Sequence, residues 1–181
     1  MRSLPLLAVA LVAASASAAS AGTYLGLGIG TAASGHVGSD TSSMGSSGDR
    51  SGRLFLGFRF GNLSIEGGVM RFSQFFKATR DDATQLSADL KYSLPLGDGF
   101  EVFGRGGLQR TQLSNDYAEI NGNGWLLGGG FEYRLNLGVT AASLFVDYTH
   151  TQTTFDQGAT GGMSSIDSSA SMWMAGATLA L

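Results

Sequence analysis

The chain has 181 residues, of which 43% are hydrophobic, 28 are glycine and two are proline. This composition fits one folded domain and is unlike that of a disordered or collagen-like chain. The formal net charge is −3 and there is no basic run, so nucleic acid is not an expected partner. Because the chain has no cysteine, disulfides and thiolate metal sites are excluded.

Residues 1–21 have the pattern of a secretory signal peptide. Arg2 provides the positive start, Leu4 to Ala14 form a short apolar core, and the small-residue run ASASAASA offers cleavage sites after Ala18 or Ala21. A membrane-spanning helix needs about 20 apolar residues, roughly twice the length of this core. We therefore expect residues 1–21 to be a signal peptide and residues 22–181 to form the exported domain.

Alternating hydrophobicity predicts the strands of that domain. The clearest example is the hairpin 54–69, whose two alternating segments are joined by Gly61 and Asn62. Eight such segments occur, at 23–31, 53–60, 63–71, 84–94, 100–110, 124–135, 143–151 and 171–181. Each is close to the 9 to 11 residues, roughly, that a tilted membrane strand needs.

The predicted connections alternate between short and long. Those after the second, fourth and sixth strands are short, at 61–62, 95–99 and 136–142. The others are longer and polar, especially 32–52 and 152–170. Short turns at one end and long loops at the other are typical of an outer-membrane barrel, so the predicted fold class is all-β, an eight-stranded antiparallel up-and-down transmembrane β-barrel.

The strands have one apolar face and one face that combines glycine with charge. The charged positions are Arg59, Glu66, Asp89, Lys91, Glu101, Arg105, Glu132, Arg134 and Asp147. A soluble lipocalin-like barrel has the same alternation turned inside out. Glycines such as Gly57, Gly107 and Gly128 suit a crowded interior, and the chain ends with the apolar Leu179 and Leu181, so we expect lipid outside.

Aromatic residues of the apolar face fall near both ends of the strands. Phe60, Tyr92, Phe100 and Tyr133 belong to the end with short turns, and Trp125, Tyr148 and Trp173 to the end with long loops. Two such groups around an aliphatic middle are typical of the aromatic girdles of membrane barrels.

Three motifs carry a family resemblance: SIEGGV at 64–69, SLPLGDGFEVFGRGG at 93–107 and LLGGGFEYRL at 126–135. They resemble the transmembrane barrel domain of the OmpA-like outer-membrane family. The resemblance implies a bacterial outer-membrane location, periplasmic termini, external loops and a salt-bridged interior. It also implies assembly by the barrel-assembly machinery, although Leu181 stands where these barrels usually end in Phe. The chain ends at the eighth strand, so we expect no peptidoglycan-binding domain.

Buried charges are tolerated only when they are paired. With the predicted turns, the expected pairs are Arg59–Glu66, Lys91–Glu101, Asp89–Arg105 and Arg134–Asp147. The favoured interpretation is a structural plug. The alternative is an ion gate in a narrow porin-like channel, for example by transfer of Arg105 from Asp89 to Glu101.

Outside the barrel interior, Arg71, Arg110, Lys77 and Arg80 are predicted near the outer interface, where cations bind lipopolysaccharide phosphates or simply remain solvated. No cofactor or metal site is expected, and we expect a monomer. Catalysis is not expected, because His36 and His150 lack a recognisable nucleophile motif. The predicted function is a non-enzymatic envelope role with surface-exposed loops. A loop-mediated adhesin is a further alternative, suggested only by the lengths of the first and fourth long loops. Aromatic residues and arginines, which dominate binding hot spots, are scarce in these loops, with Arg50 and Phe155 as the exceptions.

Overall fold

The computed structural model describes residues 21–31, 33–37, 50–72, 82–114, 119–136, 140–155 and 166–181. Within these ranges the chain forms nine strands: β1 (Ala21–Gly30), β2 (Ser34–Val37), β3 (Ser51–Phe60), β4 (Leu63–Phe72), β5 (Asp82–Gly97), β6 (Phe100–Ser114), β7 (Glu119–Asn136), β8 (Ala141–Phe155) and β9 (Ile166–Ala180). No helix in the described part of the chain is long and apolar enough to cross a membrane. The predicted signal peptide lies outside the described residues, except for Ala21 in β1.

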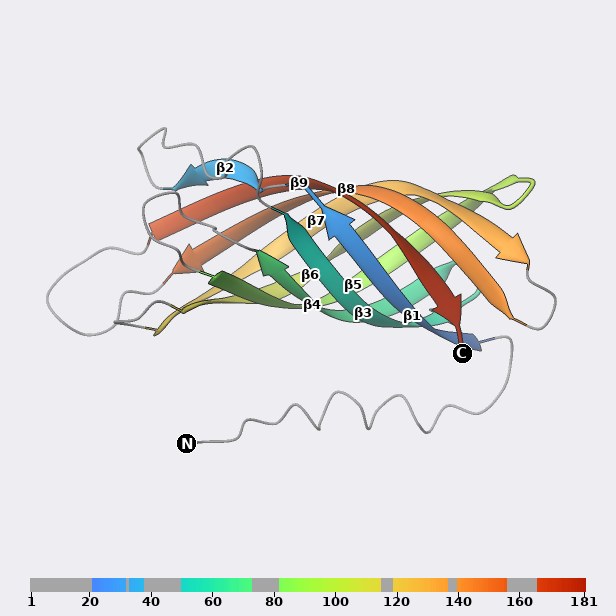
Figure 1. The fold of residues 1–181 in the computed structure, drawn as a ribbon, viewed down its shortest axis with the longest axis horizontal. Helices are drawn as coiled ribbons and strands as arrows, with labels where there is room; N and C mark the ends of the chain where they lie inside the picture. Colours follow the sequence, from blue (N-terminus) through green and yellow to red (C-terminus); the bar gives the residue numbers. More distant parts are fainter. Residues whose placement is uncertain are drawn as a thin grey trace, which may run out of the picture.

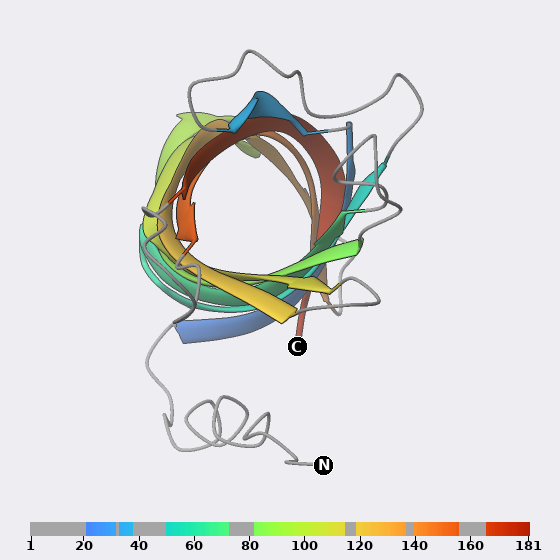
Figure 2. The ribbon, with the colours of Figure 1, turned by 90° about the vertical axis from the view of Figure 1, so that its left-hand side faces the viewer.

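The strands close into a barrel, seen along its length in Figure 1 and nearly end-on in Figure 2. All pairings are antiparallel, from β1 through β3 to β9, and β9 pairs back with β1. The short β2 also pairs with β9, nearer the start of that strand than the residues that pair with β1. Because β1 and β2 share one position in the wall, the nine segments form the predicted closed eight-stranded barrel.

The two ends of the barrel differ as predicted. Gly61 and Asn62 form the turn between β3 and β4, and Gly61 has a φ of 58°, which suits glycine. The amide of Leu181 donates to the carbonyl of Thr23 at 2.9 Å, which places the carboxyl terminus beside the start of β1. Figure 1 shows both at the end that carries the short turns.

The strands are longer than predicted at the opposite end. Strands β5 to β9 have 15 to 18 residues each. Residues 152–155 and 166–170 were predicted as loop but belong to β8 and β9, and β2 lies inside the predicted first loop. At the short-turn end, the connection predicted at 95–99 is also shorter, because β5 continues through a bulge between Pro95 and Gly97. The backbone ladder continues beyond the lipid layer, where no apolar face marks it in the sequence.

The apolar face is the outer face. Leu27 is 61% exposed and Leu108 is 72% exposed, whereas Glu66 and Asp147 are 2% and 1% exposed. All seven residues of the predicted aromatic girdles face outward. A soluble barrel with an apolar interior would have the opposite burial, so the parity indicates lipid outside.

The interior contains many large apolar side chains, whereas the predicted inner face consisted of glycine and charged residues. They include Phe55, Met70, Phe72, Phe103, Leu126, Phe145, Phe155, Met172 and Met174. Several of the rings lie directly opposite a glycine on the neighbouring strand: Tyr24 pairs with Gly57, and Phe55 with Gly26. A Cβ added at either glycine would collide with the ring. The interior glycines therefore leave space in which aromatic side chains pack and fill the lumen.

Candidate functional site

The charged residues line the lumen as predicted. Of the nine, seven are buried, Arg59 is half-buried, and Arg134 lies exposed at the mouth. A tenth interior charge, Arg53, was missed by the sequence prediction, although it has the inward parity of Phe55 and is 4% exposed. In the described residues the lumen thus contains five cations and five carboxylates, and its net charge is zero.

Arg53 lies at the centre of the network. Its Nη2 is 2.9 Å from Glu66 Oε2 and 3.3 Å from Asp89 Oδ2, and its Nη1 is 3.9 Å from Asp147 Oδ2. Its guanidinium carbon lies 4.3 Å from the centroid of the Phe55 ring, a cation–π contact. One cation from β3 therefore holds carboxylates from three other strands.

Arg105 completes the central cluster from the opposite wall. Its Nη1 is 3.3 Å from Asp89 Oδ2 and its Nη2 is 2.9 Å from Asp147 Oδ2. The same guanidinium donates to Thr149 Oγ1 at 2.5 Å. Asp89 and Asp147 thus lie between two arginines, and the cluster spans the lumen from β3 to β6.

A second layer lies nearer the short turns. Lys91 Nζ is 2.6 Å from Glu132 Oε2 and 3.7 Å from Glu66 Oε1. The Tyr24 hydroxyl donates to Glu66 Oε1 at 2.7 Å. Glu66 therefore links this layer to Arg53, and ion pairs run continuously from Glu132 to Arg105.

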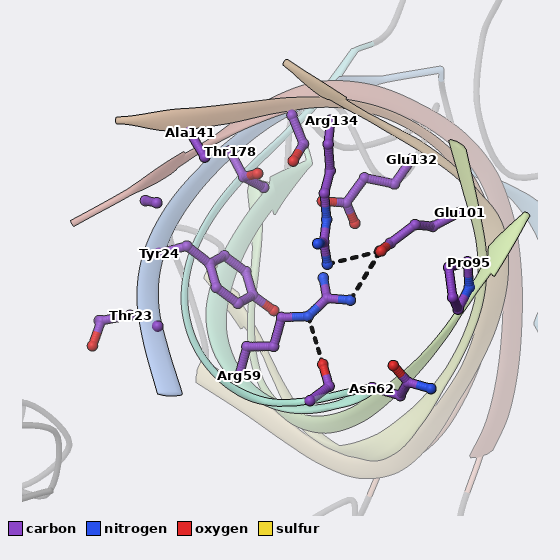
Figure 3. Close-up of a pocket in the computed structure, with 14 residues that line it drawn as sticks. Thr23, Tyr24, Arg59, Asn62, Pro95, Glu101, Glu132, Arg134, Ala141 and Thr178 are labelled. Carbon is purple, nitrogen blue, oxygen red and sulfur yellow. Dashed lines mark hydrogen bonds and ion pairs between the residues drawn. The ribbon is translucent and has the colours of Figure 1, made fainter. Parts of the chain in front are cut away.

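The rim at the short-turn end forms a separate group. Figure 3 shows Arg59 and Arg134 starting from different parts of the wall and converging on Glu101. Arg59 Nη2 is 3.0 Å from Glu101 Oε2, and Arg134 Nη2 is 2.8 Å from Glu101 Oε1. The Arg59 Nε also donates to the carbonyl of Gly61 at 2.8 Å, so the β3–β4 turn fixes this side chain.

These side chains border an open cavity of about 490 Å³ at the short-turn end. Its lining includes Arg59, Arg134 and Glu101 at the mouth, with Tyr24 and Glu132 also in its wall (Figure 3). Since Tyr24 and Glu132 belong to the second layer, that layer forms the inner limit of the cavity. We call this space the vestibule.

Three of the four predicted ion pairs are wrong. Arg59 contacts Glu101 instead of Glu66, Lys91 contacts Glu132 instead of Glu101, and Arg134 also contacts Glu101. Only the pair of Asp89 with Arg105 is confirmed. The predicted pairs followed the hairpins, whereas the long side chains reach across the lumen to residues at the same level of the barrel.

The register explains one of these differences directly. The β3–β4 turn pairs Phe60 with Leu63, so Arg59 lies opposite Ser64 and Glu66 lies opposite Gly57. Glu66 is therefore displaced along the barrel towards Arg53. The predicted gate has a related difficulty, because Glu101 belongs to the rim and Arg105 to the central cluster.

An uncharged polar group lies further towards the long loops. Gln85 donates to Gln109, and Gln109 Nε2 donates to Thr153 Oγ1 at 2.8 Å. Phe155 is buried over Gly122 at this end of β8. This contradicts the predicted place of Phe155 in a loop, whereas Arg50, which precedes β3, is exposed.

The outer wall holds the remaining predicted residues. Arg71 and Arg110 are exposed on β4 and β6, whereas Lys77 and Arg80 lie outside the described residues. His150 faces outward, as predicted, with its Nδ1 2.9 Å from Ser171 Oγ and its ring 5.8 Å from that of Trp125. The side chain of His36 is outside the description.

A closed antiparallel barrel with an apolar outer belt, aromatic girdles and a charged, paired interior defines the chain as an integral outer-membrane β-barrel protein. The comparison with family models agrees with this class. Residues 4–178 match the outer membrane protein beta-barrel domain family, and the chain belongs to that family. This places the protein in the bacterial outer membrane, and its OmpA-like features fit that assignment.

Solved structures share the fold at low sequence identity. Neisserial surface protein A is 15% identical, with a TM-score of 0.63 over 90% of this chain and 100% of that one. The attachment invasion locus protein Ail of Yersinia pestis, in complex with the heparin analogue sucrose octasulfate, is 15% identical, with a TM-score of 0.51 over 88% and 99%. AlkL is 12% identical, with a TM-score of 0.51 over 93% and 94%. No curated protein matches in sequence.

Proposed function

We propose that the protein is a non-enzymatic barrel with a structural role in the outer membrane and with loops presented at the cell surface. The observation that supports this most directly is the crossing of the lumen by the Arg53–Arg105 cluster. Buried charges that are mutually paired from opposite walls hold the wall together and leave little space for a solute. The second layer, which contains Tyr24, closes the lumen again beside the vestibule.

The envelope role is tested in a strain that lacks the gene, by uptake of a fluorescent hydrophobic probe. Expression of the intact protein is expected to restore the barrier. A variant shortened within residues 38–49 is expected to restore it equally well, because the barrel provides the function. If only the intact protein restores the barrier, the function depends on the loop. If neither does, the structural proposal is wrong.

A narrow channel is the second candidate, and the vestibule favours it. This cavity of about 490 Å³ is open at the short-turn end and contains charged side chains. Beyond it, Asp89 Oδ1, Asp147 Oδ1 and Arg105 Nε are buried with no hydrogen-bond partner among the described residues. Such atoms are suitable partners for water. Opening requires the Tyr24–Glu66 bond and the central cluster to separate.

Single-channel recording in a planar bilayer distinguishes the two candidates. The purified barrel is first shown to be folded by its heat-modifiable mobility on a gel. The structural proposal predicts no discrete openings from the folded protein. Reproducible openings that change in Arg105→Ala would instead support the channel and would contradict a permanent plug.

The non-enzymatic part of the proposal is supported by the surroundings of His150. Its only described hydrogen-bond contact is Ser171, and no described carboxylate contacts the pair to orient it. Mass spectrometry of lipid A from cells with and without the protein is expected to give the same spectrum. A difference that Ser171→Ala abolishes would contradict the proposal.

A further inference from the structure

A groove of about 510 Å³ runs along the outer wall where β1, β3, β4 and β9 meet. Its apolar lining includes Leu27, Ile29, Leu54 and Val69, with Arg71 at the end of β4 that is nearer the long loops. We call it the Arg71 groove. It combines one outward cation, Arg71, with an aliphatic channel, because the other arginine of its lining, Arg53, is buried in the lumen.

Gly52 explains why this part of the wall is hollow. In the sheet it lies directly between Ile29 of β1 and Arg71 of β4. A Cβ added at Gly52 would meet no atom within 4 Å, so the space is open outward. The groove is therefore not a consequence of packing inside the barrel, and it can be filled without disturbing the interior.

Arg71 is exposed, and no carboxylate in the described part of the chain pairs with it. Ala175, which also lines the groove, lies two residues from Trp173 of the outer aromatic girdle. The cation thus lies near the outer interface, while Leu27 and Leu54 follow their strands towards the middle of the membrane. A guanidinium binds phosphate through two parallel hydrogen bonds.

A second outer groove shows what is special about the first. It has a similar volume, about 490 Å³, and is open around Gly104 and Gly106. Its lining is aliphatic and aromatic, and its one arginine, Arg105, points into the lumen and is 4% exposed. The two grooves therefore differ mainly in the outward cation, which makes the second a natural control.

We propose that the Arg71 groove binds one phosphorylated glycolipid of the outer leaflet, lipid A, with a phosphate on Arg71 and an acyl chain along Leu27 and Leu54. Charge complementarity selects an amphiphile with an anionic head, and the position of Arg71 near the outer interface selects the phosphorylated lipid of the outer leaflet. The site is independent of whether the barrel conducts ions.

The test measures lipid A bound to the refolded barrel in detergent, by native mass spectrometry with bisphosphorylated lipid A as the probe. Arg71→Gln removes the cation, and Gly52→Leu fills the channel. Each is expected to lower the affinity about tenfold, the effect of one lost charge-assisted contact. Heat-modifiable mobility confirms that each variant is folded.

Matched controls use the other side of the barrel. Arg110→Gln removes an outward cation that does not line the groove, and Gly104→Leu fills the second groove; both are expected to bind as the unaltered protein does. If the Arg71→Gln and Gly52→Leu variants bind lipid A as well as these control variants do, the site does not exist. Equal binding of dephosphorylated lipid A would refute the role of phosphate, and equal binding of phosphatidylglycerol would refute the choice of lipid A.

Discussion

Replacement of Arg53 by methionine tests the central cluster most directly. The variant keeps an unbranched chain over Phe55 but removes the cation that contacts Glu66, Asp89 and Asp147. The lumen then holds five carboxylates and four cations in the described residues, and Arg105 alone must hold two of them. Removal of one partner from a buried ion pair costs about 3–5 kcal/mol.

We therefore expect Arg53→Met to lower the free energy of unfolding by about 3–5 kcal/mol. The assay is urea unfolding of the barrel refolded into lipid vesicles, followed by the fluorescence of Trp125 and Trp173. Arg134→Met is the matched control, because its side chain is 44% exposed. An exposed pair contributes at most about 1 kcal/mol, so this control is expected to lose little.

A double variant separates the charge effect from lost packing. Asp89→Asn in the Arg53→Met background restores neutrality and is expected to recover at least about 1 kcal/mol. Equal losses of stability in Arg53→Met and Arg134→Met would show that Arg53 does not hold the central cluster together. A further loss when Asp89→Asn is added to Arg53→Met would show that the carboxylate of Asp89 is not in excess in that variant.

Three further changes test other parts of the barrel. Gly57→Ala places a methyl group where the Tyr24 ring lies and is expected to lower the free energy of unfolding in urea by about 1–3 kcal/mol. The loss should be smaller in a Tyr24→Ala background, and an equal loss there would show that the Tyr24 ring does not pack on Gly57. Tyr24→Ala alone removes the wall beside the vestibule, yet conductance should stay absent while the Arg53–Arg105 cluster is intact; openings would show that Tyr24 is the real barrier. Lys91→Met leaves Glu132 without its partner at 2.6 Å and is expected to cost about 3–5 kcal/mol, measured in the same way, whereas a loss as small as that of Arg134→Met would contradict the pairing.

The alternation of side chains was enough to predict which residues face lipid and which face the lumen. The period of a strand is two residues, so the parity of Leu54 and Phe60 fixes that of Arg59 once the hairpin is recognised. Gly61 and Asn62 set the turn for the same local reason. The number of barrel positions and the two aromatic girdles followed from these local patterns.

No such alternation marks the polar ends of the strands or β2. Beyond the lipid layer both faces are polar, so the ladder of β8 continues to Phe155 without an apolar face to mark it. Phe155 was predicted in a loop for this reason. Its burial over Gly122 became visible only when β7 and β8 were paired.

The ion pairs were decided by the tertiary structure. Register determines the level of each charge, and the long side chains then reach carboxylates several strands away, as Arg59 reaches Glu101 and Lys91 reaches Glu132. Neither pair lies within one hairpin, so the local sequence of a hairpin does not predict it. The sequence by itself therefore determined a barrel with charge inside, and only its closure determined which charges meet, because ion pairing depends on positions across the lumen.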